Sequence, residues 1–166
     1  MHGKSIVASL LLMVLAACQS EQAPVDMTEL KEFARGYAAA WSSQDPAALA
    51  AHYAEDGIFQ VNDGEAAVGR DAVEATAGAF MEAFPDMVVE LHRLELSGEY
   101  VNFHWHWTGT NTGPGGTGAA VDLYGYEQWT FTDNGLIQQS LGHYDEVEYE
   151  QQLQSGTEET SSPESD

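Results

Sequence analysis

The chain has 166 residues, in which 27 Asp and Glu against five Lys and Arg give a formal net charge of −22 at pH 7. Such a surface repels nucleic-acid phosphates, which binding proteins neutralise with Lys and Arg, so the composition excludes a nucleic-acid partner. The acidity has two interpretations: a solvated coat, or attraction of a cationic ligand or metal ions. Because the acids are scattered rather than clustered, the sequence favours the coat.

The first 17 residues have the pattern of a secretory signal peptide. A short lead with His2 and Lys4 precedes an apolar run over residues 6–17, which is too short for a stable transmembrane helix. The run ends in Leu-Ala-Ala before Cys18, and this ending resembles the bacterial lipobox, in which the thiol is lipidated. A lone cysteine has no internal disulfide partner, which favours lipidation over an ordinary signal peptide that holds a cysteine.

We therefore expect a signal peptide over residues 1–17 and a polar tether over residues 18–27. The mature protein is expected to be extracytoplasmic and anchored to the membrane through a lipid on Cys18. Gln19 resembles the residue that follows the cysteine in lipoproteins sorted to an outer membrane, which would place the protein on the periplasmic side in a Gram-negative host.

Three helices are expected in the first half of the domain. The first begins at Thr28, and its apolar side chains recur at three- and four-residue steps, which makes one stripe. A shorter helix begins at Asp45-Pro46, with the aspartate as N-cap and proline at the first helical position. This second helix is expected to bury His52 and Tyr53. A third helix follows residue 69 and stops at residue 85, a proline.

Strands dominate the remainder. A short strand over residues 58–61 precedes the third helix, and a strand over residues 87–96 follows it. Three long antiparallel strands are expected over residues 100–108, 119–132 and 136–145, then a short helix to residue 153. The predicted fold class is α+β, with helices packed on one curved antiparallel sheet around a cone-shaped pocket. Residues 154–166 hold no large apolar side chain and are expected to form a disordered acidic tail.

Several motifs resemble the SnoaL-like, polyketide cyclase-like branch of the nuclear transport factor 2-like superfamily: residues 41–57, 69–72, 84–86, 109–113 and 135–153. The resemblance covers about residues 28–153 and implies a cone-shaped sheet packed against three helices. Members include cyclases, steroid isomerases, dehydratases and proteins that only bind or assemble. In the cyclases, a carboxylate on the last strand is the general acid/base of a cofactor-free aldol closure. Asp145 matches that carboxylate, whereas Gln139 and Leu141 replace the usual Glu and Trp.

Asp145 is accordingly the main catalytic candidate. It can act as a general base if an apolar pocket raises its pKa, since desolvation disfavours the charged form. The alternative is an N-cap for the last helix. His104 and His106 lie two apart on a strand and share one face, and His143 shares a face with Asp145. The opposite face of the first histidine strand carries Phe103, Trp105 and Trp107.

The three histidines also raise the question of a metal. Imidazoles and a carboxylate are legitimate zinc or iron ligands, but residues 108–118 lack the glutamate that the cupin metal motif requires. We therefore expect neither metal nor cofactor, and assign His104, His106 and His143 as hydrogen-bonding groups that assist Asp145. Aromatic side chains are expected to line the ligand pocket: Trp41, Tyr53, Phe59, Tyr124, Tyr126 and Trp129.

The leading functional prediction is a pocket for a small apolar or aromatic molecule, with cofactor-free acid/base catalysis of the cyclase, isomerase or dehydratase type. One alternative is a non-catalytic, small-molecule-binding lipoprotein that uses the same pocket. Another is a structural homodimer formed through an exposed face of the sheet, since such a face can be self-complementary.

Overall fold

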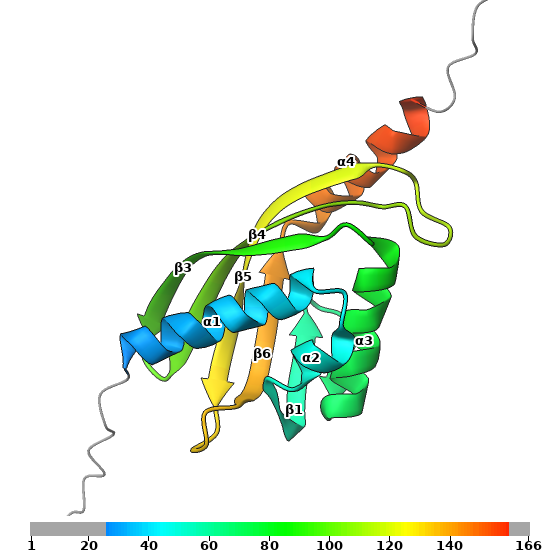
Figure 1. The fold of residues 1–166 in the computed structure, drawn as a ribbon. Helices are drawn as coiled ribbons and strands as arrows, with labels where there is room; N and C mark the ends of the chain where they lie inside the picture. Colours follow the sequence, from blue (N-terminus) through cyan, green and yellow to red (C-terminus); the bar gives the residue numbers. More distant parts are fainter. Residues whose placement is uncertain (1–25, 160–166) are drawn as a thin grey trace, which may run out of the picture.

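The computed structural model describes residues 26–159, which form a curved six-stranded sheet and four helices (Figure 1). The α+β class and the cone-like sheet agree with the sequence-based prediction. The signal peptide, Cys18 and most of the tether lie outside the described residues, so the lipid anchor and the location stay predictions. Within the described range, every helix is too short or too polar to cross a membrane.

The helices begin where the sequence places N-caps. Helix α1 (Met27–Ser42) follows Asp26, whose side chain accepts a hydrogen bond from the Thr28 backbone N–H. Helix α2 (Pro46–Ala50) follows Asp45, as predicted. Helix α3 (Arg70–Ala83) ends just before the predicted stop. The fourth helix, α4 (Glu146–Glu159), extends six residues beyond its predicted end. Its Glu and Gln are good helix formers, so a polar composition is compatible with an exposed helix.

The strands pair in the order β2-β1-β6-β5-β4-β3. Strands β3 to β6 form the predicted antiparallel meander, while β1 pairs parallel to β6 and antiparallel to β2. The sheet is therefore mixed at one edge. The strand bounds are β1 Tyr53–Val61, β2 Ala67–Val68, β3 Val88–Ser97, β4 Tyr100–Thr110, β5 Ala120–Phe131 and β6 Ile137–Tyr144.

Strand β1 begins five residues earlier than the sequence suggests. Tyr53, expected on the second helix, pairs with Ile137 in the sheet and is fully buried. The register then shifts between Tyr53 and Ile58, so residues 54–57, which include Glu55 and Asp56, form an irregular part of the strand. A bulge of this kind breaks the alternating pattern on which strand prediction depends.

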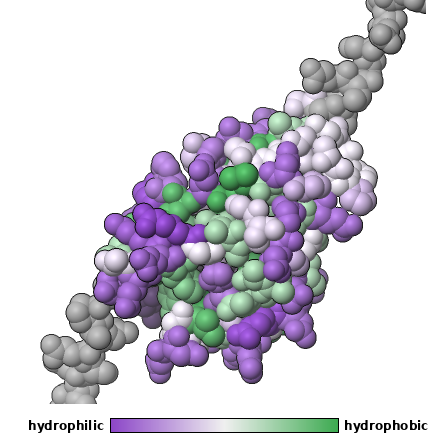
Figure 2. All heavy atoms as spheres, viewed as in Figure 1, coloured by the Kyte–Doolittle hydropathy of each residue, from purple (hydrophilic) through white to green (hydrophobic). Residues whose placement is uncertain are grey.

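The helices and the sheet enclose one apolar layer. On β4, Phe103, Trp105 and Trp107 are buried, whereas His104 and His106 are half-buried on the other face, which confirms the predicted alternation. Helices α1 and α3 supply rings that contact the buried row, including Tyr37 against Phe103 and Phe80 against Trp107. In Figure 2, hydrophilic residues spread over the visible face rather than gathering in one patch.

Candidate functional site

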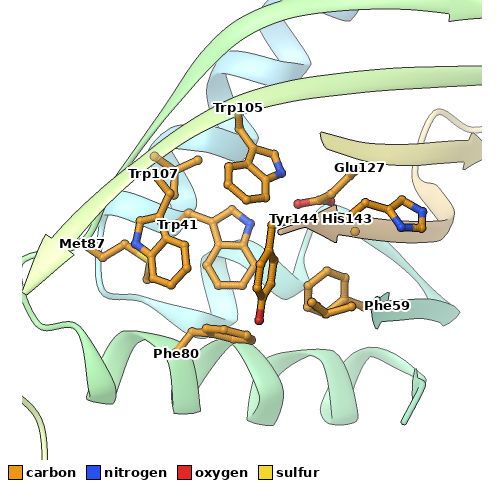
Figure 3. A pocket seen from close by; sticks show the side chains of 12 residues that line it. Trp41, Phe59, Phe80, Met87, Trp105, Trp107, Glu127, His143 and Tyr144 are labelled. Atoms are coloured by element: carbon orange, nitrogen blue, oxygen red, sulfur yellow. The ribbon is translucent and has the colours of Figure 1, made fainter. Parts of the chain in front are cut away.

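A cavity of about 60 Å³ lies between the inner face of the sheet and the helices α1 and α3 (Figure 3). Since one buried water needs about 10–15 Å³, the cavity has room for a few waters or a very small organic molecule. It is far smaller than the roughly 300–1,000 Å³ pockets of drug-sized ligands. The lining residues are Trp41, Phe59, Val61, Phe80, Met87, Val89, Trp105, Trp107, Glu127, Gly142, His143 and Tyr144.

The walls of the cavity are mainly aromatic, and each ring is placed by its element. The stripe of α1 ends in Trp41, α3 contributes Phe80, and the buried row of β4 contributes Trp105 and Trp107. The Phe80 ring stands at 85° to both the Trp41 and Trp107 rings, with centroids 6.0 and 6.2 Å away. The rings of Trp41, Phe80 and Trp107 thus bound the cavity on different sides, and this arrangement is called the aromatic box.

Glu127 is the one carboxyl side chain among the residues that line the cavity. It occupies the inward-facing row of β5, where only 5% of it is exposed. Its Oε2 accepts hydrogen bonds from Tyr37 Oη at 2.8 Å, Trp129 Nε1 at 2.9 Å and Ser140 Oγ at 2.5 Å. Among the described residues, Oε1 has no hydrogen-bond partner. One carboxyl oxygen is thus held in place, and the other is available to a ligand.

A second tyrosine extends this network. The hydroxyls of Tyr37 and Tyr53 lie 2.8 Å apart. Because Tyr37 donates its proton to Glu127, Tyr53 is the donor in this pair. Burial, followed by the nearby charge of Glu127, raises the pKa of both phenols well above the ordinary value. Both tyrosines therefore remain neutral hydrogen-bond donors while Glu127 titrates.

Burial also raises the pKa of Glu127, although the bonds from Ser140, Trp129 and Tyr37 stabilise its ionised form and oppose the shift. Desolvation is the larger effect because the surrounding walls are almost entirely apolar. A carboxyl with a raised pKa can accept and release a proton closer to neutral pH than a surface carboxyl. The geometry therefore makes Glu127 a candidate general acid/base.

Glu127→Gln is expected to change how stability depends on pH. Because folding raises the pKa of Glu127, the folded protein binds this proton more tightly than the unfolded chain. The resulting stabilisation is complete below the unfolded-state pKa of Glu127 and is lost as pH rises through the folded-state pKa. The free energy of unfolding of the wild type, relative to Glu127→Gln, should thus fall across that window in urea titrations. A difference that is constant or grows with pH would contradict the buried carboxyl.

The predicted ligand-binding residues fall into two groups. Trp41 and Phe59 line the cavity. Tyr53 and Trp129 lie behind it, where Trp129 donates directly to Glu127 and Tyr53 acts through Tyr37. The other two, Tyr124 and Tyr126, lie on the outer face of the sheet instead, because they follow the opposite alternation on β5.

The predicted histidines also lie on that outer face. His106 stacks on Tyr124, with ring centroids 4.3 Å apart, and Tyr126 contacts the rings of both His104 and His143. His143 borders the cavity, yet its ring points away from it in Figure 3. The structure thus gathers the three histidines around two tyrosines and separates their rings from the cavity. The homodimer through this face stays a prediction.

Asp145 has the position expected of an N-cap, which is the alternative role that the sequence suggested for it. It is exposed, and its Oδ1 accepts hydrogen bonds from the backbone N–H groups of Val147 and Glu148, both at 3.0 Å. These bonds make it the N-cap of α4. Asp145 is not among the residues that line the cavity. No contact with Glu127 links it to the buried network within residues 26–159, and its catalytic role stays untested.

Sequence reasoning missed Glu127, although a signal was present. Alternate residues of β5 point inward: Val121, Leu123, Gly125, Glu127 and Trp129. An acid in the middle of an otherwise apolar row is unusual, because buried charges require partners or a shifted pKa. In the part of the chain that the structure describes, no three His, Cys, Asp or Glu side chains are arranged to hold a metal ion.

A second, more open hollow of about 550 Å³ lies beside α3, next to the glycine-rich connection between β4 and β5. Its polar side chains, Gln44, Glu82 and Thr112, are all exposed. Because this hollow holds no desolvated polar group, it lacks the convergent chemistry of the aromatic cavity.

Comparison with known proteins agrees with this architecture. A family model described as a SnoaL-like domain matches residues 34–140. No curated protein matches the sequence.

Solved structures share the fold at low sequence identity. A putative SnoaL-like polyketide cyclase from Jannaschia is 17% identical, with a TM-score of 0.68 over 86% of this chain and 99% of that one. A hypothetical protein with a ketosteroid isomerase-like fold from Catenulispora acidiphila, in complex with trimethylamine, is 18% identical. Its TM-score is 0.65 over 74% of this chain and 92% of that one. An epoxide hydrolase from M. tuberculosis is 15% identical, with a TM-score of 0.62 over 78% of this chain and 92% of that one. At these identities, the similarity establishes the fold alone.

Proposed function

Because the chain belongs to the SnoaL-like family, we propose that its cavity binds a small, largely apolar molecule and that Glu127 exchanges a proton with it without a cofactor. The single observation that carries this proposal is the buried carboxyl with one anchored and one free oxygen. Proton transfer of this kind is the shared chemical step of cyclase, isomerase and dehydratase reactions.

The position of Glu127 favours it over Asp145. A general base must reach the substrate and hold a pKa suited to its task. Glu127 lines the cavity and its pKa is raised by burial, whereas Asp145 uses its carboxylate to cap α4. His104, His106 and His143 direct their rings to the other face of the sheet, so the proposed reaction does not use them.

The hydrogen-bond network supports both protonation states of Glu127. When Glu127 is ionised, the donors Tyr37, Trp129 and Ser140 stabilise the charge on Oε2 and orient Oε1 as a base. Once Oε1 has taken a proton, the apolar walls favour the neutral acid, which can return the proton to another atom. The low polarity of the aromatic walls strengthens each polar interaction inside.

Two further groups support a substrate that carries an oxygen. The indole nitrogens of Trp105 and Trp107 are buried, and neither has a hydrogen-bond partner among residues 26–159. Unpaired buried donors are costly, so a substrate oxygen that approached either N–H would relieve a penalty. A hydrogen-bond donor near a general base can also stabilise the enolate that forms as the base removes the adjacent proton.

The size of the cavity limits the substrate. About 60 Å³ suits a molecule, or a terminal group, of only a few heavy atoms. The similar protein from Catenulispora acidiphila in complex with trimethylamine, a molecule of four heavy atoms, supports a ligand of this size within the fold.

The test is hydrogen–deuterium exchange of small ketones, such as acetone and 2-butanone, followed by proton NMR in D₂O with the purified protein. The protein should accelerate exchange over the same buffer, and the rate should rise with pH as Glu127 ionises. Absence of acceleration for every ketone that binds would overturn the catalytic proposal. Binding without exchange would instead support the alternative of a non-catalytic binding protein.

A further inference from the structure

We propose that the ligand of this cavity carries a small alkylammonium group, which the aromatic rings surround and whose charge Glu127 balances. The inference rests on the proposed function because it uses the same cavity and the same carboxyl. It goes further by assigning the chemical class of the bound group.

The aromatic walls suit a positive charge. The π-face of an aromatic ring attracts cations, by about 2 kcal/mol or more when the site is desolvated, and tryptophan is the strongest of the rings. Three tryptophans line the cavity: Trp41, Trp105 and Trp107. Phe80 stands at 85° to two of them, so the rings enclose a space from several directions. Such a box matches the nearly spherical shape of a methylated ammonium group.

The charges of the lining point in the same direction, whereas the unpaired indole N–H groups of Trp105 and Trp107 suit an oxygen elsewhere on the same ligand. Among the lining residues there is no Lys or Arg, and the ring of His143 points outward. Glu127 therefore has no cationic partner in the cavity, and its three hydrogen bonds all involve Oε2. A buried carboxylate without a counter-ion is costly. An alkylammonium ion beside Oε1 would remove that cost, whereas an anionic ligand would increase it.

The whole protein adds a long-range attraction. Its net charge is −22, and only Lys31, Arg35, Arg70 and Arg93 carry positive charge after residue 25. A strongly negative field raises the local concentration of cations and their rate of association. The composition alone suggested that the acidic residues form a solvated surface. The same residues therefore also increase the rate at which a cationic ligand reaches the cavity.

The experiment compares a cation with a neutral molecule of similar shape. Tetramethylammonium chloride and tert-butyl alcohol are titrated into isotopically labelled wild-type protein at constant ionic strength, and binding is followed through the tryptophan indole N–H signals. The cation should bind at least tenfold more tightly than the alcohol. Equal affinities would overturn the inference, and this comparison needs no variant.

A variant then assigns the preference to Glu127. Glu127→Gln should remove the preference, so that the cation and the alcohol bind this variant with similar affinity. Glu74→Gln, which removes an equal charge from an exposed position of α3, should keep the preference. If both variants weaken cation binding equally, the attraction comes from the overall charge rather than from the cavity, and the inference fails.

The pH dependence provides a second readout. Cation binding requires ionised Glu127, so affinity for tetramethylammonium should increase as pH rises through the raised pKa of that carboxyl. Three tyrosines surround Glu127: Tyr37 in direct contact, Tyr53 behind it, and Tyr144 in the cavity wall. Their raised pKa values keep all three neutral, and the ring of His143 points away from the cavity. Affinity for tert-butyl alcohol should not increase.

The results separate this inference from the proposed function. Ketone exchange that depends on Glu127, without any preference for the cation, would overturn only the assignment of ligand class. Tight, Glu127-dependent binding of tetramethylammonium without exchange of any ketone would keep the ligand class and overturn the catalytic proposal.

Discussion

Glu127→Gln should reduce protein-catalysed exchange of small ketones by about 10²- to 10⁴-fold, which is the usual contribution of a general acid/base. The amide keeps the size of the side chain and can still accept a hydrogen bond from Tyr37 or Ser140 through its oxygen. It cannot take a proton from a carbon atom at neutral pH. The rate is measured by NMR in D₂O, with circular dichroism to confirm that the variant is folded.

Asp145→Asn is the matched control for this substitution. Asparagine is as good an N-cap as aspartate, so α4 should remain in place and the exchange rate should change little. The reverse pattern, with activity lost in Asp145→Asn and retained in Glu127→Gln, would contradict the account. It would instead identify Asp145 as the base, as its position in the cyclase-like motif suggests.

Gly125→Ala should cost at least about 1–3 kcal/mol of stability, the usual range for overpacking a core, and alter the cavity. A Cβ at this position would overlap the Trp105 ring and lie 2.5 Å from the backbone oxygen of His143. Because Trp105 lies against Gly125, its partner on β5, and also lines the cavity, displacement of its ring should alter the cavity. Unfolding in urea measures the loss, and tetramethylammonium binding should weaken as the cavity changes.

Gly142→Ala is the control for the glycine on the neighbouring strand. An added Cβ there would meet its nearest atoms at 3.5 to 3.8 Å, which is ordinary van der Waals contact. This variant should therefore lose much less stability than Gly125→Ala. Equal losses would show that the Trp105 ring is not packed against Gly125 as described.

The arrangement of elements could be predicted because its signals are local. The stripe of α1, the N-cap at Asp45 and the alternation on β4 each depend on neighbouring residues, and all three agree with the structure. The predicted start of β1 was five residues too late. Its bulge depends on pairing with β6, a strand about 80 residues later in the chain, so neighbouring residues give no signal for it.

The site was harder to predict because it depends on which face of the sheet the helices cover. Alternation correctly separated His104 and His106 from Trp105 and Trp107, but could not show that α1 and α3 cover the tryptophans. Residue type then drew attention to the histidines, since imidazoles are common catalytic groups. Glu127 was overlooked because acids in strands usually face solvent.

The measurement that tests the central claim most directly is a carbon-13 NMR titration of the Glu127 carboxyl in the wild-type protein, with its signal assigned by comparison with Glu127→Gln. The account predicts a midpoint above the ordinary range of glutamate, because burial among aromatic rings disfavours the charged form. Added tetramethylammonium should lower that midpoint, since the cation stabilises the carboxylate. A midpoint at or below the ordinary value in the free protein would contradict the assignment of Glu127 as the acid/base of the cavity.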